Sequence, residues 1–302
     1  MTRGIPSAAG LSVAVVGPGA IGTSVAAALH EAGVPALLCG RTARPRLELR
    51  TADGVIVVPG PVRTDPADVR APVDLVLLAV KATQVEAAAP WLAALCHADT
   101  VVCVLQNGVD QVALVSPHVP GSPVVPAVVW FPAEAQSDGS VLLRGTPRLT
   151  LPDVPEACVV ADALRGGRCA VELVADFPSA AGQKLVMNAV GGLMALAGRR
   201  AGIFRRDDIA RLARAYAREC LRVARAEGAD LDDELADRIV DGLRASPADM
   251  GSSILADREA GRPLEWEARN GVILARGRAH GLPMPVSEVV VPLLAAASDG
   301  PG

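Results

Sequence analysis

Residues 11–22 read LSVAVVGPGAIG, and this stretch decides the fold of the N-terminal half of the chain. Its first six residues are apolar apart from one serine and are rich in valine, which predicts a buried strand. Glycines at positions 17, 19 and 22 follow directly and lead into an alanine-rich segment that is typical of a helix. A strand, a Gly-x-Gly-x-x-Gly loop and a helix in this order are the fingerprint of a dinucleotide-binding site.

Each glycine of this loop has its own physical task. Gly17 permits the tight turn after the strand, Gly19 lets a pyrophosphate approach the backbone, and Gly22 lets helix and strand pack closely. Ala20 and Ile21 contribute the first N–H groups of the helix, which favour a bound phosphate together with the helix dipole. We therefore expect these residues to bind a dinucleotide, and the alternative is a glycine-rich turn without a ligand.

The end of the second predicted strand, residues 36–39, indicates which dinucleotide binds. An NAD site places an acidic residue here, because a carboxylate accepts a hydrogen bond from the ribose 2′-hydroxyl. This chain has GRTAR at residues 40–44 instead. Guanidinium groups suit a 2′-phosphate, so Arg41 and Arg44 predict NADP or NADPH as the cofactor. The alternative is that both are ordinary surface arginines.

Two patterns of secondary structure divide the chain. Short apolar segments alternate with alanine-rich segments between residues 11 and 174, which is typical of a parallel sheet with crossover helices. After Phe177 only helical periodicity remains. We expect an α/β fold, with a doubly wound sheet domain at residues 1–176 followed by an all-helical domain at residues 177–302. Strands are predicted at 11–16, 36–39, 74–80 and 100–105, and helices at 23–31, 83–95, 180–196, 207–227, 232–243 and 264–280.

Composition and charge argue against several classes of partner. Apolar residues make up 51% of the chain and its formal charge is −4, with no long basic block, so nucleic acid is not an expected partner. Residues 4–29 carry no charge, but their five glycines argue against a membrane span or a signal peptide. The six cysteines form no C-x-x-C pair. We expect reduced packing thiols, no metal site and a cytoplasmic protein.

Scarce residue types stand at informative places. Only Lys81 and Lys184 are lysines among the 29 basic residues. An ammonium group can give up a proton whereas a guanidinium cannot, so both lysines are candidate functional residues. Lys81 and Asn107 each follow a predicted strand, and the carboxyl edge of an open α/β sheet is where ligands bind.

Lys184 and Asn188 are four residues apart on a predicted helix and so share one of its faces. That face could be turned toward a cleft between the domains, which would bring the two side chains to the ligand. The alternative is a solvated lysine and an asparagine that is bonded to the backbone.

A series of short motifs occurs in order between residues 11 and 294. They are GPGAIG at 17–22, VKATQ at 80–84, QNG at 106–108, KLVMN at 184–188, SSILAD at 252–257, EWEARNG at 265–271 and RAHGLPMP at 278–285. Together they resemble the ketopantoate reductase family, whose reaction belongs to pantothenate biosynthesis. The resemblance implies a Rossmann domain joined to a helical domain, with NADPH at the glycine loop. It also implies hydride transfer to the ketone carbon of a small 2-oxo acid such as 2-dehydropantoate.

The resemblance also implies roles for individual residues. Lys184 matches the general acid of the family, and Glu265 matches the carboxylate that orients this lysine and the substrate. Because Glu267 lies close by, the sequence leaves open which glutamate faces the site. Arg41 matches the residue that binds the 2′-phosphate. The matching cofactor contacts are Lys81 and Asn107, and the matching substrate contacts are Asn107, Lys184, Asn188, Ser253 and Glu265.

Two segments depart from the family pattern. Gly192 stands where the family commonly has a second asparagine, and PAVVWF at residues 126–131 is more apolar than usual. We therefore expect one substrate hydrogen bond fewer and a more apolar pocket wall. A bulkier oxo acid or an imine is then a second candidate substrate. A non-catalytic NADP-binding sensor or scaffold is a third hypothesis, which the presence of Lys184 and Glu265 opposes. A homodimer is a further expectation.

Overall fold

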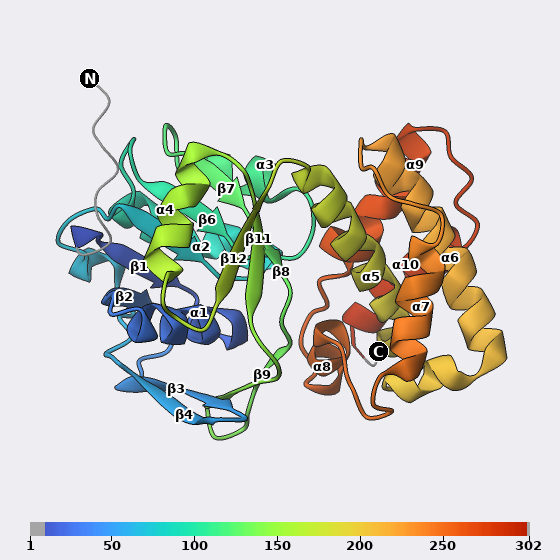
Figure 1. The fold of residues 1–302 in the computed structure, drawn as a ribbon, viewed down its shortest axis with the longest axis horizontal. Helices are drawn as coiled ribbons and strands as arrows, with labels where there is room; N and C mark the ends of the chain where they lie inside the picture. The colour runs from blue at the N-terminus through green and yellow to red at the C-terminus, as the bar shows by residue number, and fades with distance from the viewer. Residues whose placement is uncertain (1–9, 301–302) are drawn as a thin grey trace. The chain divides into compact units, whose positions relative to one another are not determined.

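The computed structural model describes residues 10–300 and divides into two compact units (Figure 1). Unit 1 contains the chain up to Gln106 together with Asp110–Phe177. Unit 2 contains Asn107–Val109 and the chain from Pro178 onward. Unit 2 therefore includes a three-residue piece that unit 1 flanks on both sides. The start of the uncharged stretch, residues 4–9, lies outside the described residues.

Unit 1 is built on a five-stranded sheet in which every neighbouring pair is parallel. The strand order is β2-β1-β5-β6-β7. Successive strands are therefore added on one side of β1 first and then, from β5 onward, on its other side. Ligands of doubly wound sheets bind at this reversal, outside the carboxyl ends of the strands. The strands are β1 Val13–Val16, β2 Ala36–Cys39, β5 Leu75–Leu78, β6 Val101–Val104 and β7 Val124–Pro126.

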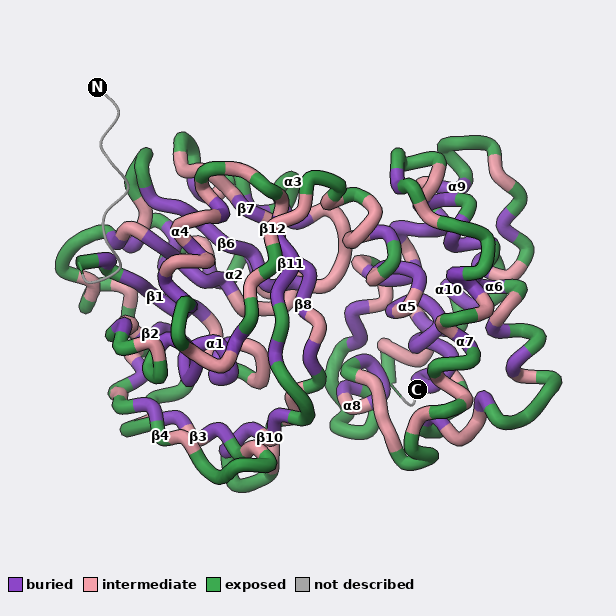
Figure 2. Tube along the Cα trace, viewed as in Figure 1, coloured by how far each residue is buried: buried purple, intermediate pink, exposed green. Residues whose placement is uncertain are grey.

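Helices cover both faces of this sheet. In β1, Val13 and Val15 pack in one core cluster with residues of α1 (Ala20–Glu31) and α4 (Pro155–Leu164). The intervening residues of β1 pack in a second cluster with α2 (Val85–Leu95) and α3 (Gln111–Val115). Figure 2 shows β1 as a buried strand. Because both faces are covered, the strands are continuously apolar, which is why the four predicted strands were recognisable from the sequence.

Two smaller sheets complete unit 1, with the strand orders β4-β3-β10-β9 and β12-β11-β8. None of their strands is among those predicted from the sequence. Most are short, and β10 pairs with β3 although the two are far apart in the chain. The strands are β3 Arg46–Thr51, β4 Gly54–Pro59, β8 Val128–Val129, β9 Ala133–Ala135, β10 Val141–Leu143, β11 Arg148–Pro152 and β12 Ala170–Val174.

Unit 2 is helical, as expected, and α5 contributes eleven buried residues to it. The single helix predicted at 264–280 is wrong in detail, because the chain forms a π-helical turn at Glu267–Gly271 before α9 begins. Insertion of a π-turn shifts the helical register and is frequent at functional sites. The helices are α5 Phe177–Ala197, α6 Asp207–Ala226, α7 Leu235–Ala245, α8 Ser253–Glu259, α9 Val272–Ala279 and α10 Ser287–Ser298.

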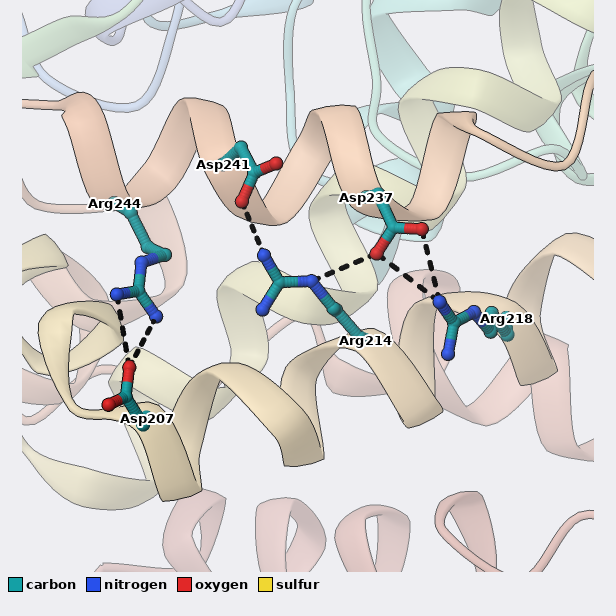
Figure 3. Close-up of polar contacts among 6 residues, drawn as sticks. All are labelled: Asp207, Arg214, Arg218, Asp237, Asp241 and Arg244. Carbon is teal, nitrogen blue, oxygen red and sulfur yellow. Dashed lines mark hydrogen bonds and ion pairs between the residues drawn. The ribbon is translucent and has the colours of Figure 1, made fainter.

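Ion pairs join α6 and α7 along their exposed sides (Figure 3). They link Arg214 to Asp237 and Asp241, Arg218 to Asp237, and Arg244 to Asp207. The fork of Arg214 reaches two carboxylates one helical turn apart, which a lysine could not do with the same geometry. Each exposed pair contributes only about 0.2–1 kcal/mol, so the network supports the helix packing without dominating it.

Within residues 10–300, no helix is long and apolar enough to cross a membrane, and no cluster of His, Cys, Asp and Glu side chains could hold a metal ion. All six cysteines are free thiols. Burial raises the pKa of Cys39 to about 12 and that of Cys96 to about 11. These two groups therefore stay protonated, as is typical of packing residues.

Candidate functional site

Two glycines of the loop after β1 are required by close packing. Gly17 has a φ of +88°, and a Cβ at this position would lie 2.7 Å from Val80 Cγ1. A Cβ at Gly22 would lie 2.2 Å from the Gly17 carbonyl oxygen and 3.2 Å from Ala79 Cβ. No larger side chain fits either position without displacing the loop or α1.

Gly19 is different, because a Cβ there would have no atom within 4 Å. It precedes α1, and within the described part of the chain no side chain caps this helix and its first turn has no acidic residue. The N–H groups at Ala20 and Ile21 therefore begin a helix beside open space. This arrangement fits the pyrophosphate of a dinucleotide, which the helix dipole and the first N–H groups would hold.

The arginines near the carboxyl end of β2 differ in their contacts. Arg41 is exposed directly after Gly40. Arg44 donates from Nη1 to the Gly139 carbonyl oxygen at 3.0 Å, so this group already has a partner. The backbone of Arg63 pairs with Cys39, and its carbonyl accepts from the Gly40 N–H at 2.9 Å. Arg63, which pairs with Asp68 at 3.8 Å, is thus a third arginine near this strand end, which spacing in the sequence could not reveal.

Lys81 lies three residues beyond β5, at the strand end next to the glycine loop. The Ala79 N–H donates to the Val16 carbonyl at 2.8 Å, so the chain segments after β5 and β1 are adjacent. Lys81 is half-buried, and its N–H donates to Gln84 Oε1 at 3.3 Å. The sequence placed Lys81 at the carboxyl edge of the sheet, and the structure has it there.

In unit 2 the structure brings Asn107, Asn188 and Glu265 together. Asn188 Nδ2 donates to Asn107 Oδ1 at 3.2 Å, and Asn107 Nδ2 donates to Glu265 Oε2 at 3.4 Å. Gly108 makes this possible, since its φ is +103° and a Cβ there would lie 2.9 Å from the Ala268 carbonyl oxygen. Three residues that are far apart in the chain therefore form one polar cluster.

The two neighbouring glutamates have different environments. Glu265 is only 6% exposed and accepts from Asn107, whereas Glu267 is exposed at the start of the π-helical turn. The structure therefore places Glu265, and not Glu267, in the polar cluster.

Lys184 is half-buried on α5, one helical turn before Asn188. The spacing puts both side chains on one face of this helix, as the sequence indicated. Ser253 is exposed in the first turn of α8, and its Oγ accepts from Arg269 Nη1 at 2.8 Å. Arg269 in turn donates from Nη2 to the Asn188 carbonyl oxygen at 3.0 Å. Through this arginine, Ser253 is connected to the polar cluster.

Arg269 is a residue that sequence reasoning missed. It is 2% exposed and is the largest of the fully buried side chains among residues 10–300. Burial lowers the pKa of its guanidinium, and the carboxylates of Glu265 and Asp257 act in the opposite direction. The only signal in the sequence is its position four residues after Glu265, inside a segment that otherwise has helical periodicity.

Gly192 leaves room for a buried polar side chain. A Cβ at Gly192 would lie 2.9 Å from Asn270 Nδ2, whereas one at Gly191 would make an ordinary contact, 3.5 Å from Arg269 Nη2. Asn270 is fully buried and donates to the Ala189 carbonyl oxygen and the Tyr216 hydroxyl. An asparagine at 192 would therefore collide with Asn270. The expected loss of a substrate hydrogen bond at this position stays a prediction.

Trp130, in the apolar segment at residues 126–131, has partners in the small sheet. Its Nε1 donates to Thr150 Oγ1 at 2.9 Å, and the Arg148 guanidinium lies 5.0 Å from the centre of its ring. These contacts give Trp130 a structural role within unit 1. The expectation that this segment forms an apolar pocket wall stays a prediction.

Unit 2 also has a hollow of about 440 Å³, lined by apolar side chains of α5, α6 and α10 and the adjoining loops. No charged side chain lines it. A small carboxylate requires charged or polar partners, so this hollow does not suit an oxo acid.

Comparisons with known proteins show similarity along nearly the whole chain. The model of ketopantoate reductase PanE/ApbA matches residues 13–156, and the model of its C-terminal part matches residues 176–298. The chain is 59% identical to the 2-dehydropantoate 2-reductase of Mycobacterium tuberculosis, covering 96% of this chain and 99% of that one. It is 39% identical to the enzyme of the same name from Caulobacter vibrioides, covering 95% of this chain and 99% of that one.

A solved structure with a similar fold is the dimeric ketopantoate reductase from Staphylococcus aureus, with a TM-score of 0.88 at 29% identity. The match covers 97% of this chain and 100% of that one. The family models together span both units, and the relatives are matched over nearly their whole length. The chain therefore belongs to the ketopantoate reductase PanE/ApbA family.

Proposed function

We propose that this chain reduces 2-dehydropantoate to pantoate with NADPH, and that Lys184 donates the proton to the ketone oxygen. Membership of the family makes it an NADP-dependent oxidoreductase. The observation that carries the residue assignment is the hydrogen-bonded set of Asn188, Asn107 and Glu265. Of these three residues, Asn188 lies on α5 one helical turn from Lys184, which is one of only two lysines in the chain.

Unit 1 supplies all the proposed cofactor contacts except Asn107, which belongs to unit 2. NADPH, when bound, supplies the hydride. Gly17 and Gly22 shape the loop, and the open space at Gly19 lets the pyrophosphate reach the N–H groups of Ala20 and Ile21. At the other end of the cofactor, Arg41 binds the 2′-phosphate. Lys81 and Asn107 provide further cofactor contacts.

Lys184 acts on the substrate oxygen. Negative charge develops on that oxygen as the ketone is reduced, so an ammonium group within hydrogen-bond reach stabilises the transition state more than the ground state. The same group then gives up a proton to the oxygen, which an arginine could not do. The Glu265 carboxylate orients the lysine and the substrate. Asn107, Asn188 and Ser253 hold the remaining polar groups of the substrate.

The proposal is tested by measuring NADPH oxidation at 340 nm with 2-dehydropantoate beside bulkier and more apolar 2-oxo acids and an imine. We expect 2-dehydropantoate to give the highest kcat/KM. A higher value for a bulkier oxo acid or an imine would reassign the substrate, as the departure at Gly192 suggests. Tight NADPH binding without turnover of any compound would favour the sensor or scaffold.

Replacing Arg41 with alanine should raise the KM for NADPH about tenfold or more and leave the KM for NADH nearly unchanged. The reason is that the variant loses a charged hydrogen bond to the 2′-phosphate, a group that NADPH has and NADH does not. Arg44→Ala is the matched control, because the Arg44 guanidinium already donates to Gly139. Equal losses with NADPH and NADH in the Arg41 variant would contradict the assignment.

Replacing Glu265 with glutamine should lower kcat/KM for 2-dehydropantoate about 10²-fold, since a neutral amide keeps the shape but cannot orient the lysine by charge. The same change at exposed Glu267 should have little effect. Steady-state kinetics of the two variants side by side checks this. A Glu267→Gln variant with the larger loss would show that the wrong glutamate was chosen.

Three broader assignments are proposals as well. We place the domains at residues 1–176 and 177–302, with support from the start of the C-terminal family match at residue 176. We propose a homodimer, with support from the Staphylococcus aureus ketopantoate reductase, which is described as dimeric. A cytoplasmic location follows from the expected reduced thiols.

A further inference from the structure

A buried arginine, Arg269, lies behind the polar cluster of unit 2. It is 2% exposed and stands in the π-helical turn Glu267–Gly271. Removing a guanidinium from water costs several kcal/mol unless charge and hydrogen bonds compensate. If residue 269 served packing alone, a leucine or methionine would be buried at a lower free-energy cost. The contacts of Arg269 therefore need a specific explanation.

The first contact fixes a hydroxyl group. Arg269 Nη1 donates to Ser253 Oγ at 2.8 Å. A guanidinium has donors only, so the serine oxygen is the acceptor and its own proton is left to donate elsewhere. Ser253 is exposed, whereas Arg269 is not. The hydroxyl is thus prepared to donate to an acceptor on its open side, such as a carboxylate oxygen.

The second contact determines which amide atoms of Asn188 and Asn107 donate and which accept. Arg269 Nη2 donates to the carbonyl oxygen of Asn188 at 3.0 Å and to its Oδ1 at 3.5 Å. Asn188 Oδ1 is therefore an acceptor, and Nδ2 donates to Asn107 Oδ1. Asn107 Nδ2 in turn donates to Glu265 Oε2. A cation that can only donate stands at one end and a carboxylate at the other, so both amide groups have one orientation.

We propose that Arg269 is a positioning residue for the oxo acid, which acts through Ser253 and Asn188 to fix the donors and acceptors that meet the substrate. The inference rests on the proposed function, because it assigns these two residues to the substrate site. Charge-assisted hydrogen bonds polarise the groups that accept them, so Ser253 becomes a stronger donor to an anion.

The experiment compares Arg269→Leu with the wild type by steady-state kinetics, and by calorimetric binding of 2-dehydropantoate to the NADP⁺-saturated protein. We expect the KM and the Kd for 2-dehydropantoate to rise about tenfold or more, with a smaller change in kcat. The Kd for NADPH should stay the same. Arg262→Leu is the matched control, since Arg262 pairs with buried Asp257 at 3.0 Å and should affect stability but not KM.

A double-mutant cycle separates positioning from a purely structural role. In a Ser253→Ala background, Arg269→Leu should raise the KM several-fold less than it does in the wild type, because the shared partner is already gone. Equal effects in both backgrounds, or an unchanged KM in folded Arg269→Leu protein, would overturn the inference. If Arg269→Leu does not fold, Arg269→Lys takes its place in the cycle, because it keeps the charge but not the two-pronged geometry.

The wild-type protein distinguishes this inference from the proposed function. If it neither binds nor reduces 2-dehydropantoate, the proposed function fails and the role of Arg269 fails with it. If it does both and the variants match it, only the role of Arg269 is refuted.

Discussion

Lys184→Ala should lower kcat for 2-dehydropantoate reduction about 10²- to 10⁴-fold, the usual contribution of a positioned general acid. The variant has neither the proton donor nor the cation that stabilises the developing negative charge. The Kd for NADPH should stay unchanged, because the proposed cofactor contacts lie on other residues. Stopped-flow measurement of a single turnover with saturating NADPH isolates the chemical step from product release.

The matched control is Gln183→Ala, which truncates an exposed neighbour on the same helix and should behave like the wild type. Lys184→Arg should not restore the activity, since a guanidinium does not release its proton. A kcat of Lys184→Ala within about threefold of the wild-type value would remove this residue from the mechanism, given the expected size of the effect.

Gly19→Ala should raise the Kd for NADPH about 10²-fold without lowering the melting temperature, as the loss of roughly 2–3 kcal/mol of phosphate contacts implies. A methyl group there meets no protein atom within 4 Å, so the free protein tolerates it. It fills the space that the pyrophosphate needs. Fluorescence titration with NADPH and thermal unfolding of the free protein provide the two readouts.

Gly22→Ala is the counterpart in which the clash is internal. Its methyl group would lie 2.2 Å from the Gly17 carbonyl oxygen, so the variant should lose about 1–3 kcal/mol of stability and unfold at a lower temperature. Its loss of NADPH affinity would then accompany a change in the free protein. Should Gly19→Ala bind NADPH as tightly as the wild type, the open space would not be the phosphate site.

Four of the five strands of the central sheet could be predicted from the sequence, because burial on both faces makes them continuously apolar, whereas the three-residue strand β7 was missed. The strands of the two smaller sheets could not be predicted. β8 has two residues, and β10 pairs with β3 through contacts between distant segments. Strand pairing of this kind depends on tertiary contacts, which leave little local pattern in the chain.

Site residues differ in the same way. Lys81 and Asn107 could be identified as candidates from the sequence because a strand end has a fixed place at the edge of a sheet. Arg269 could not be identified in this way, because in the sequence it resembles the many surface arginines of this chain. Only its burial and its three acceptor atoms on Ser253 and Asn188 set it apart. The register of a π-turn cannot be read from apolar spacing, so the orientation of residue 269 depends on the structure.

The placement of Asn107–Val109 within unit 2 has a consequence for how this family can recombine. A crossover near Phe177 between two homologous genes would join Asn188 and Glu265 of one parent to Asn107 of the other. The hydrogen bonds among the three would then form only if the parent that supplies residue 107 has a side chain there that fits Asn188 and Glu265 of the other parent. The helical unit is thus not a module that one continuous stretch of gene can transfer.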